Sequence, residues 1–306
     1  MNIFYQYIYK TALLVNDWKL GNYRYIFFVS YIKSLYIIKI MKKEIQAYFI
    51  DLDGTLLDLP EGEETLSSAN VKAVVKLNKT KPVIISTGRS NSEFVLSLVK
   101  LLKCPYAICQ NGALIVDKKN KVLARYEMEQ NQVDEIVKLL KEEEMFFIFN
   151  GENKIYCNYE SSAYMRPWTA KLEKLKYSDL GQKTNVTKIL TFGKDEIATK
   201  NFKNFLAKKY PSLAFHIVSK GYSIEITHKN ATKGKGAAFV CDLLKIDPKN
   251  AAHIGDSGND LNALPEIGTF IAMENAMDEV KEVAHYIGPS FENSGIAKLF
   301  KDLKEI

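Results

Sequence analysis

The acidic octapeptide at residues 51–58, DLDGTLLD, directly follows the apolar run Tyr48–Ile50. An apolar run that ends at two carboxylates one residue apart is typical of a buried strand whose C-terminal end opens onto a binding site. Because neighbouring carboxylates repel each other, both stay ionised only where something compensates, and a divalent cation does so most simply. Asp and Gly are also ordinary turn residues. The octapeptide therefore predicts either a cation site at a strand end or an acidic turn.

Short apolar strands and amphipathic helices alternate in the first and last thirds of the remaining chain. This alternation predicts an α/β fold with a Rossmann-like parallel sheet and helices on both faces. In the middle of the chain strands occur in adjacent pairs, such as Phe146–Asn150 with Ile155–Tyr159, which indicates a separate α+β domain inserted into the first. The expected division is a core of residues 41–124 and 221–306 and an inserted α+β cap of residues 125–220.

Residues 1–40 differ in composition from the rest of the chain. They carry seven of the 17 tyrosines, and their five basic residues against one acid account for most of the formal net charge of +6. The apolar stretch Tyr25–Ile40 is interrupted by Lys33, so it is too short for a membrane span, and no signal-peptide cleavage site follows. A weak interfacial membrane anchor is the alternative. We expect residues 1–40 to be an upstream extension outside the fold, with Met41 as a natural start.

The composition limits the class of protein. Hydrophobic content of 47% and charged content of 25% are those of a globular protein. Without the first forty residues little net charge remains, so nucleic acid is excluded as a partner and a small anionic substrate is favoured. Four cysteines without paired or metal-ligand spacing indicate reduced thiols of an intracellular, cytoplasmic protein. They are Cys104, Cys109, Cys157 and Cys241.

Three further motifs follow a short strand or open a helix. The segment Ile84–Arg89, IISTGR, places a hydroxyl, a glycine and a cation at a strand end. Thr232–Gly236, TKGKG, places a lysine at a helix start, where the backbone amides also favour anions. Ile254–Asp260, IGDSGND, adds two carboxylates and an amide at another strand end. In an open α/β sheet such strand ends share one edge, so the four motifs are expected to converge on one crevice.

Together the four motifs supply carboxylates for a hard cation, donors for a phosphate and a carboxylate nucleophile. Mg²⁺ prefers a few carboxylates together with water and phosphate oxygens. Phosphoryl transfer depends mainly on charge neutralisation and positioning. A carboxylate can accept the phosphoryl group while a second acid protonates the leaving group. This set of side chains therefore indicates phosphoryl-transfer chemistry.

The order and spacing of DLDGTLLD, STGR, the helix-opening Lys233 and GDSGND resemble the haloacid dehalogenase superfamily. More narrowly the chain is similar to the Cof-type phosphatases, which carry an αβ cap between the second and third motifs. The resemblance covers about Met41 to the C-terminus and includes the Asn111–Ala113 segment. It implies a Mg²⁺-dependent phosphatase that hydrolyses a small phosphorylated metabolite through an aspartyl-phosphate intermediate.

The resemblance also implies a role for each motif residue. Asp51 would be the nucleophile and a metal ligand, and Asp53 the general acid/base whose backbone carbonyl also reaches the metal. The phosphoryl group would be bound by Thr87, Gly88 and Lys233. The metal would have Asp256 as a direct ligand and Asn259 near its waters, and Asp260 would either bind the metal or orient Lys233. The substrate or the cap would be contacted by Arg89 and Asn111.

Two other functions use the same residues. A phosphomutase would return the phosphoryl group to a sugar, and a non-catalytic sensor would only bind a phosphorylated ligand. Among substrates, sugar phosphates are the first expectation, followed by cofactors such as flavin mononucleotide or pyridoxal phosphate. The four histidines, His216, His228, His253 and His285, show no ligand spacing, which favours packing or surface roles.

Overall fold

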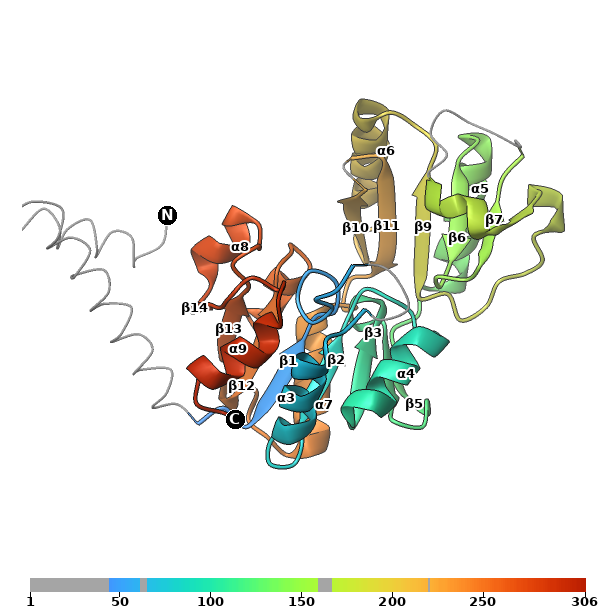
Figure 1. Cartoon of the computed structure of the whole chain (residues 1–306). Helices are drawn as coiled ribbons and strands as arrows, with labels where there is room; N and C mark the ends of the chain where they lie inside the picture. Colours follow the sequence, from blue (N-terminus) through green and yellow to red (C-terminus); the bar gives the residue numbers. More distant parts are fainter. Residues whose placement is uncertain (1–43, 61–64, 159–166, 220) are drawn as a thin grey trace, which may run out of the picture.

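The computed structural model describes residues 44–60, 65–158, 167–219 and 221–306. The expected N-terminal extension, residues 1–40, lies outside this part of the chain. Within it, no helix is both long enough and apolar enough to span a membrane. The chain forms a core domain and a second domain that sits on one edge of it (Figure 1). We call the second domain the cap.

The core is built on an eight-stranded sheet with the order β14-β13-β12-β1-β2-β3-β4-β5. Neighbouring strands from β14 to β3 are parallel, and β4 and β5 add an antiparallel hairpin at one edge. The predicted α/β class with a parallel core sheet is therefore confirmed. The strands are β1 (Ala47–Ile50), β2 (Val83–Ser86), β3 (Tyr106–Cys109), β4 (Leu114–Asp117), β5 (Val122–Arg125), β12 (Ala251–Gly255), β13 (Thr269–Ala272) and β14 (Tyr286–Ile287).

Helices cover both faces of this sheet (Figure 1). Strand β1 is buried on both faces because its side chains alternate: Tyr48 and Ile50 pack with α3, α4 and α9, whereas Phe49 packs with α7. Strands buried on both faces read as continuous apolar runs, which is why the sequence revealed them. The core helices are α3 (Ser68–Leu77), α4 (Glu93–Leu102), α7 (Lys233–Leu244), α8 (Asp278–Val283) and α9 (Gly295–Asp302).

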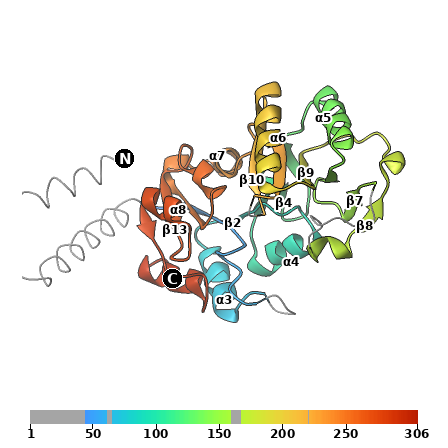
Figure 2. The same ribbon diagram turned by 90° about the horizontal axis from the view of Figure 1, so that it is seen from above.

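The cap contains a six-stranded sheet with the order β10-β11-β9-β6-β7-β8. Two helices, α5 (Gln130–Glu142) and α6 (Glu196–Lys209), lie above it (Figure 2) and share an apolar core with one of its faces. The other face carries a smaller apolar cluster that includes Phe146, Ile148 and Phe192, and Leu172 packs against it. The strands are β6 (Phe146–Phe149), β7 (Lys154–Tyr156), β8 (Glu173–Leu175), β9 (Lys188–Phe192), β10 (Leu213–Val218) and β11 (Ser223–His228).

The cap sheet extends beyond residue 220, where the sequence placed the end of the cap. Strand β11 pairs along its length with β10 and also with β9, so it belongs to the cap sheet and not to the core. The side chains of Ile224 and Ile226 are buried in the apolar core of the cap. We therefore propose a boundary just after His228, before the helix that opens with Lys233.

Candidate active site

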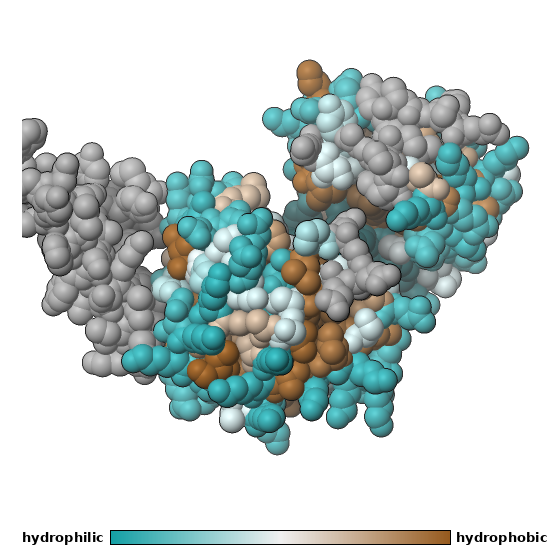
Figure 3. Space-filling view, viewed as in Figure 1, coloured by the Kyte–Doolittle hydropathy of each residue, from teal (hydrophilic) through white to brown (hydrophobic). Residues whose placement is uncertain are grey.

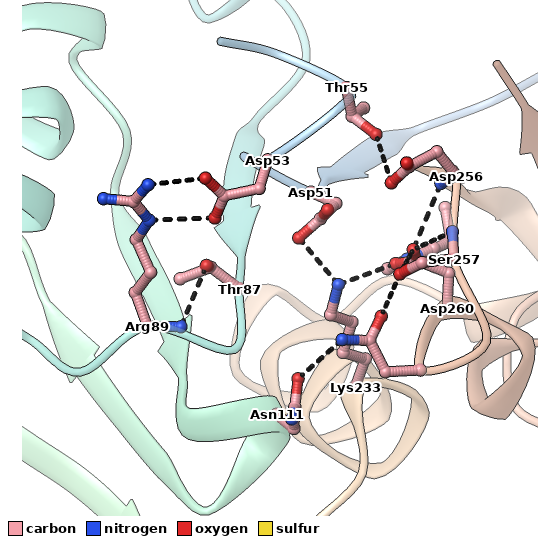
Figure 4. Close-up of polar contacts among 12 residues, drawn as sticks. Asp51, Asp53, Thr55, Thr87, Arg89, Asn111, Lys233, Asp256, Ser257 and Asp260 are labelled. Atoms are coloured by element: carbon pink, nitrogen blue, oxygen red, sulfur yellow. Dashed lines mark hydrogen bonds and ion pairs between the residues drawn. The ribbon is translucent and has the colours of Figure 1, made fainter. Parts of the chain in front are cut away.

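The four motifs meet at the C-terminal edge of the parallel core sheet (Figure 4). Asp51 follows β1, Thr87 follows β2 and Asp256 follows β12, the three neighbouring central strands. Lys233 begins α7, whose first turn is capped by the hydroxyl of Thr232. The convergence expected from the sequence is therefore present, because parallel strands bring their carboxyl ends to one edge.

Lys233 is the centre of the site and is completely buried. Its Nζ atom lies 2.7 Å from Oδ1 of Asp51 and 2.8 Å from Oδ1 of Asp260. Burial alone would lower the pKa of Lys233, but the two carboxylates prevail and raise this pKa above its usual range. The lysine is consequently a fixed positive charge that holds the Asp51 side chain in one orientation.

The three carboxylates of Asp51, Asp256 and Asp260 come close enough to hold a metal ion. One oxygen from each lies within 4.8 Å of the others. Burial is the main cause that raises the pKa of Asp51 to about 7, with Asp260 and Asp256 adding to the shift and Lys233 opposing it. Burial and the neighbouring Asp260 raise the pKa of Asp256 to about 6. A divalent cation at this point would relieve the repulsion, so the donor set fits a hard cation.

Asp260 differs from the other two because both of its oxygens already accept hydrogen bonds. Oδ1 accepts from Lys233 and from Nε2 of His253 at 2.7 Å, and Oδ2 accepts from the backbone amides of Asp256 at 3.2 Å and Ser257 at 3.1 Å. Burial opposes ionisation, yet Lys233 and His253 hold the pKa of Asp260 below its usual range. Asp260 therefore fixes the loop that presents Asp256.

His253 is a site residue that the sequence analysis missed. Of the expected packing or surface roles, the completely buried ring in β12 has the packing role, but it also contacts Asp260 directly, which the sequence did not indicate. It also stacks on Phe270 of the neighbouring strand β13. Burial lowers the pKa of His253. The available signal was a polar residue inside an otherwise apolar strand, three residues before Asp256.

Asp53 lies apart from the carboxylate cluster and points to Arg89 (Figure 4). The guanidinium binds the carboxylate with two hydrogen bonds, Nε to Oδ2 at 2.8 Å and Nη2 to Oδ1 at 2.5 Å. Both side chains are about half exposed, at 41% and 54%. The backbone amide of Arg89 donates to Oγ1 of Thr87 at 3.1 Å. The two predicted groups Asp53 and Arg89 thus form one exposed pair beside the buried cluster.

Asn111 connects the core to the cap. Its backbone is left-handed, with φ of 56°. The Nδ2 atom donates to Oε1 of Glu225 in the cap at 2.6 Å, and Oδ1 accepts from Nδ2 of Asn259 at 3.1 Å. Gly88, another predicted residue, accepts a hydrogen bond on its carbonyl from Lys188 of the cap at 3.1 Å. Asn111 and Gly88 therefore both contact the cap.

Gly54 allows the acidic turn to pass close to the second acidic loop. Its φ of +74° is left-handed, and a Cβ atom there would lie 2.4 Å from Oδ2 of Asp256. The hydroxyl of Thr55 lies 3.4 Å from Oδ1 of Asp256. A side chain at position 54 would displace the carboxylate that the cluster needs.

An α/β core with acidic turns at two strand ends, a Ser/Thr-Gly loop and a helix-opening lysine is typical of phosphoryl-transfer hydrolases. The family model of the haloacid dehalogenase-like hydrolases matches residues 48–300, and the chain belongs to this family. The resemblance of the four motifs is thereby confirmed. The protein is a phosphatase of this family, a phosphoric monoester hydrolase.

Individual relatives agree with the family. A 5-amino-6-(5-phospho-D-ribitylamino)uracil phosphatase of Bacillus subtilis is 29% identical over 282 residues, which is 83% of this chain and 96% of the relative. A phosphoglycolate phosphatase of Archaeoglobus fulgidus is 26% identical, covering 84% and 96%. Among solved structures, a phosphatase of the same superfamily from Bacteroides thetaiotaomicron has a TM-score of 0.73 at 20% identity, covering 86% and 97%. That structure has the same fold.

Proposed function

We propose that this protein is a Mg²⁺-dependent phosphatase that hydrolyses a small phosphorylated metabolite through an aspartyl-phosphate at Asp51. The observation that carries the proposal is the buried Lys233 between Asp51 and Asp260, with Asp256 completing a cluster of carboxylates. None of the acids or the lysine is missing, which argues against a sensor that binds its ligand without turnover.

In the first step an Oδ atom of Asp51 attacks the phosphorus, and the bond from phosphorus to the leaving oxygen breaks. Asp53 donates its proton to that oxygen, so the product leaves as an alcohol. In the second step a water attacks the phosphorus and gives a proton to Asp53, and the Asp51–phosphorus bond breaks to release phosphate. Lys233 opposes the carboxylate and phosphate charges throughout.

Mg²⁺ would be held by Asp51, Asp256 and the backbone carbonyl of Asp53, and it would neutralise charge on the transferring phosphoryl group. Asn259 would lie near the waters of the ion. The hydrogen bonds that already occupy Asp260 support an indirect role, in which it orients Lys233 and the Asp256 loop. Thr87, Gly88 and Lys233 are the expected phosphoryl-binding groups.

Arg89 has a role in controlling Asp53. While the guanidinium pairs with the Asp53 carboxylate, Asp53 cannot act as a proton donor. A substrate phosphate attracts the same guanidinium, because phosphate and carboxylate have similar bidentate geometry. Arrival of the substrate would therefore release Asp53 for proton transfer at the leaving oxygen.

Sugar phosphates are the first candidate substrates, and phosphorylated cofactors are the second. The phosphoribityl substrate named for the Bacillus subtilis relative supports a leaving group that carries several hydroxyls. The Archaeoglobus relative acts on phosphoglycolate, whose leaving group is an anion. The two relatives thus differ in the charge of the group that the cap would have to accept.

The test is phosphate release with Mg²⁺ from a panel of sugar phosphates, nucleotides and phosphorylated cofactors, by the wild type and by Asp51→Asn. The substitution keeps the size of the side chain and removes the nucleophile, so we expect kcat to fall at least about 10³-fold. Asp134→Asn, on the exposed face of α5, is the matched control and should retain full activity. Turnover that survives Asp51→Asn, or that needs no divalent cation, would reject the mechanism.

A further inference from the structure

The face of the cap sheet that points away from α5 and α6 carries a charged pair, Lys188 on β9 and Glu225 on β11. Successive residues of a strand point to opposite faces of the sheet. Ile189, which follows Lys188, and Ile226, which follows Glu225, are buried in the apolar core beneath α5 and α6. The side chains of Lys188 and Glu225 therefore point to the opposite face. Their contacts with the core domain show that this face is directed at the candidate active site.

The pair contacts two loops of the candidate active site, the one that carries Gly88 and the one that carries Asn111. Nζ of Lys188 donates to the carbonyl of Gly88, beside Thr87, at 3.1 Å and to Oε2 of Glu225 at 3.3 Å. Oε1 of Glu225 accepts from Asn111, which in turn contacts Asn259 in the acidic loop. Figure 3 shows the surface hollowed between the core and the cap. The pair thus lies on the cap side of the contact between the cap and the loops that carry Gly88 and Asn111.

The two charges are largely removed from water and cancel each other. The side chains are 11% and 12% exposed. Among the described residues Lys188 Nζ donates two hydrogen bonds, so its third N–H can donate to a ligand. The Glu225 carboxylate accepts two hydrogen bonds from described residues, so its remaining lone pairs can accept from a ligand. A hydroxyl group both donates and accepts, so it matches what the pair still offers.

We propose that Lys188 and Glu225 bind the leaving group of the substrate and select an uncharged, hydroxyl-bearing group over an anionic one. The proposal rests on the phosphatase function proposed above. A carboxylate on the leaving group would need an uncompensated cation, but Glu225 already neutralises Lys188 and would repel a second anion. The cap therefore fits a polyol or sugar monophosphate and disfavours a phosphorylated hydroxy acid.

The test compares substrates that differ only by CH₂OH against carboxylate. We use two such pairs, glycerol 3-phosphate with 3-phosphoglycerate and glucitol 6-phosphate with 6-phosphogluconate, and measure kcat/KM for each with Mg²⁺. The wild type should prefer the neutral member at least tenfold. Glu225→Gln leaves Lys188 as a free cation, so the ratio of neutral to anionic kcat/KM should fall at least tenfold. Lys188→Gln leaves Glu225 alone, so the ratio should rise.

Glu173→Gln is the matched control, because Glu173 belongs to an exposed pair with Lys154 on the same cap sheet. It should leave the ratio unchanged. A wild type that hydrolyses both members equally well overturns this inference while its Mg²⁺- and Asp51-dependent turnover keeps the proposed function. Glu225→Gln and Lys188→Gln variants that lower both rates equally also overturn it, since the pair would then only hold the cap against the core. A wild type that releases phosphate from neither pair, but does so from a phosphorylated cofactor or nucleotide of the wider panel, overturns this inference alone. A wild type that releases none from any member of the panel overturns the proposed function as well.

Discussion

The single buried residue Lys233 contributes both to the stability of the fold and to the proposed catalysis, because it pairs with Asp51 and Asp260. Lys233→Met would leave Asp260 and Asp51 buried without their cation. Removing one partner of a buried ion pair costs about 3–5 kcal/mol, so we expect a loss of this size in the free energy of unfolding, together with loss of phosphate release. Urea unfolding of the variant and the wild type, followed by circular dichroism, measures the difference.

Lys235→Met is the matched comparison for Lys233→Met. Lys235 lies two residues further along α7, is 48% exposed and pairs with Glu266. Exposed pairs contribute only about 0–1 kcal/mol, so this variant should unfold almost like the wild type and keep its activity. If the two variants lost similar free energies of unfolding, the buried cluster would contribute no more to stability than an exposed ion pair does.

The raised pKa values of Asp51 and Asp256 predict how pH couples to the metal. The folded, metal-free protein holds these protons more tightly than the unfolded chain, whose carboxyls ionise near pH 4. The contribution of these two carboxyls to the stability therefore falls as the pH rises from about 4 to about 7, because the unfolded state loses these protons first. A bound cation needs both carboxyls ionised, so its affinity rises over the same interval.

The measurement is the midpoint of thermal unfolding, Tm, from pH 5 to pH 8 with EDTA and with saturating Mg²⁺. The Tm with Mg²⁺ minus the Tm with EDTA should widen as the pH increases, and most of the widening should occur between about pH 5 and 7, where Asp51 and Asp256 lose their protons. Asp256→Asn removes a ligand and should abolish the increment. An increment in the wild type that stays constant across this range would contradict the assignment of these two carboxyls.

The site residues that the sequence could predict all lie in motifs. Asp51 and Lys233 were identifiable because strand-end and helix-start positions are recognisable from local pattern, and parallel topology then brings them together. Lys188 and Glu225 lie in strands, where no local pattern distinguishes a site residue from a surface or core residue, and His253 was marked only by its polarity within an apolar strand. Their roles depend on which strand pairs with which, and that depends on contacts between residues far apart in the chain.

At the scale of one element, Gly54 shows how a turn sets the geometry of the cluster. Gly54→Ala would place a methyl group 2.4 Å from a carboxylate oxygen of Asp256 at a backbone φ of +74°. The left-handed conformation costs a non-glycine residue about 1–2 kcal/mol, and displacement of Asp256 should weaken Mg²⁺ binding at least tenfold. Mg²⁺ titration monitored by Tm, together with urea unfolding, measures both effects.

Gly181→Ala is the control for Gly54→Ala, because a Cβ atom at Gly181 has no neighbour within 4 Å among the described atoms. This variant should match or slightly exceed the stability of the wild type, since alanine restricts the unfolded chain more than glycine. Its Mg²⁺ affinity should not change. A Gly54→Ala protein with unaltered Mg²⁺ affinity would show that Asp256 does not depend on the close approach of this turn.

The elements themselves were largely predictable, whereas their assignment to sheets was less so. The apolar pattern predicts the strand Ser223–His228, but the change of pattern along the chain predicts the end of the cap at residue 220. Its pairing with β9 and β10 places it in the cap sheet, and a strand's partners are not encoded in its own apolar pattern. The physical reason is that sheets form by non-local contacts, while periodicity reports only which faces are buried.

At the scale of the whole molecule, hydrogen bonds between the two domains link substrate selection to catalysis. Gln110 of the core loop contacts Thr187 and the backbone of Asn150 in the cap, next to the contacts of Asn111 and Gly88. In the proposed function the chemistry belongs to the core sheet edge, and the choice of substrate belongs to the cap strands that contact it. Such a division lets one catalytic edge serve caps of different selectivity.

The contacts at the start of the described core indicate which part of the chain the fold requires. Ile45 is already buried, and the backbone amide of Gln46 donates to the carbonyl of Asn250 at 2.7 Å, so the core is engaged from this point onward. Strand β1 then lies between β2 and β12 at the centre of the sheet. A chain that starts at Met41 retains all of these contacts. We therefore expect its Tm and its kcat/KM to equal those of the full chain within error. A drop of several degrees in Tm, or recovery of only the full chain in the membrane fraction after centrifugation, would instead assign residues 1–40 a stabilising or anchoring role.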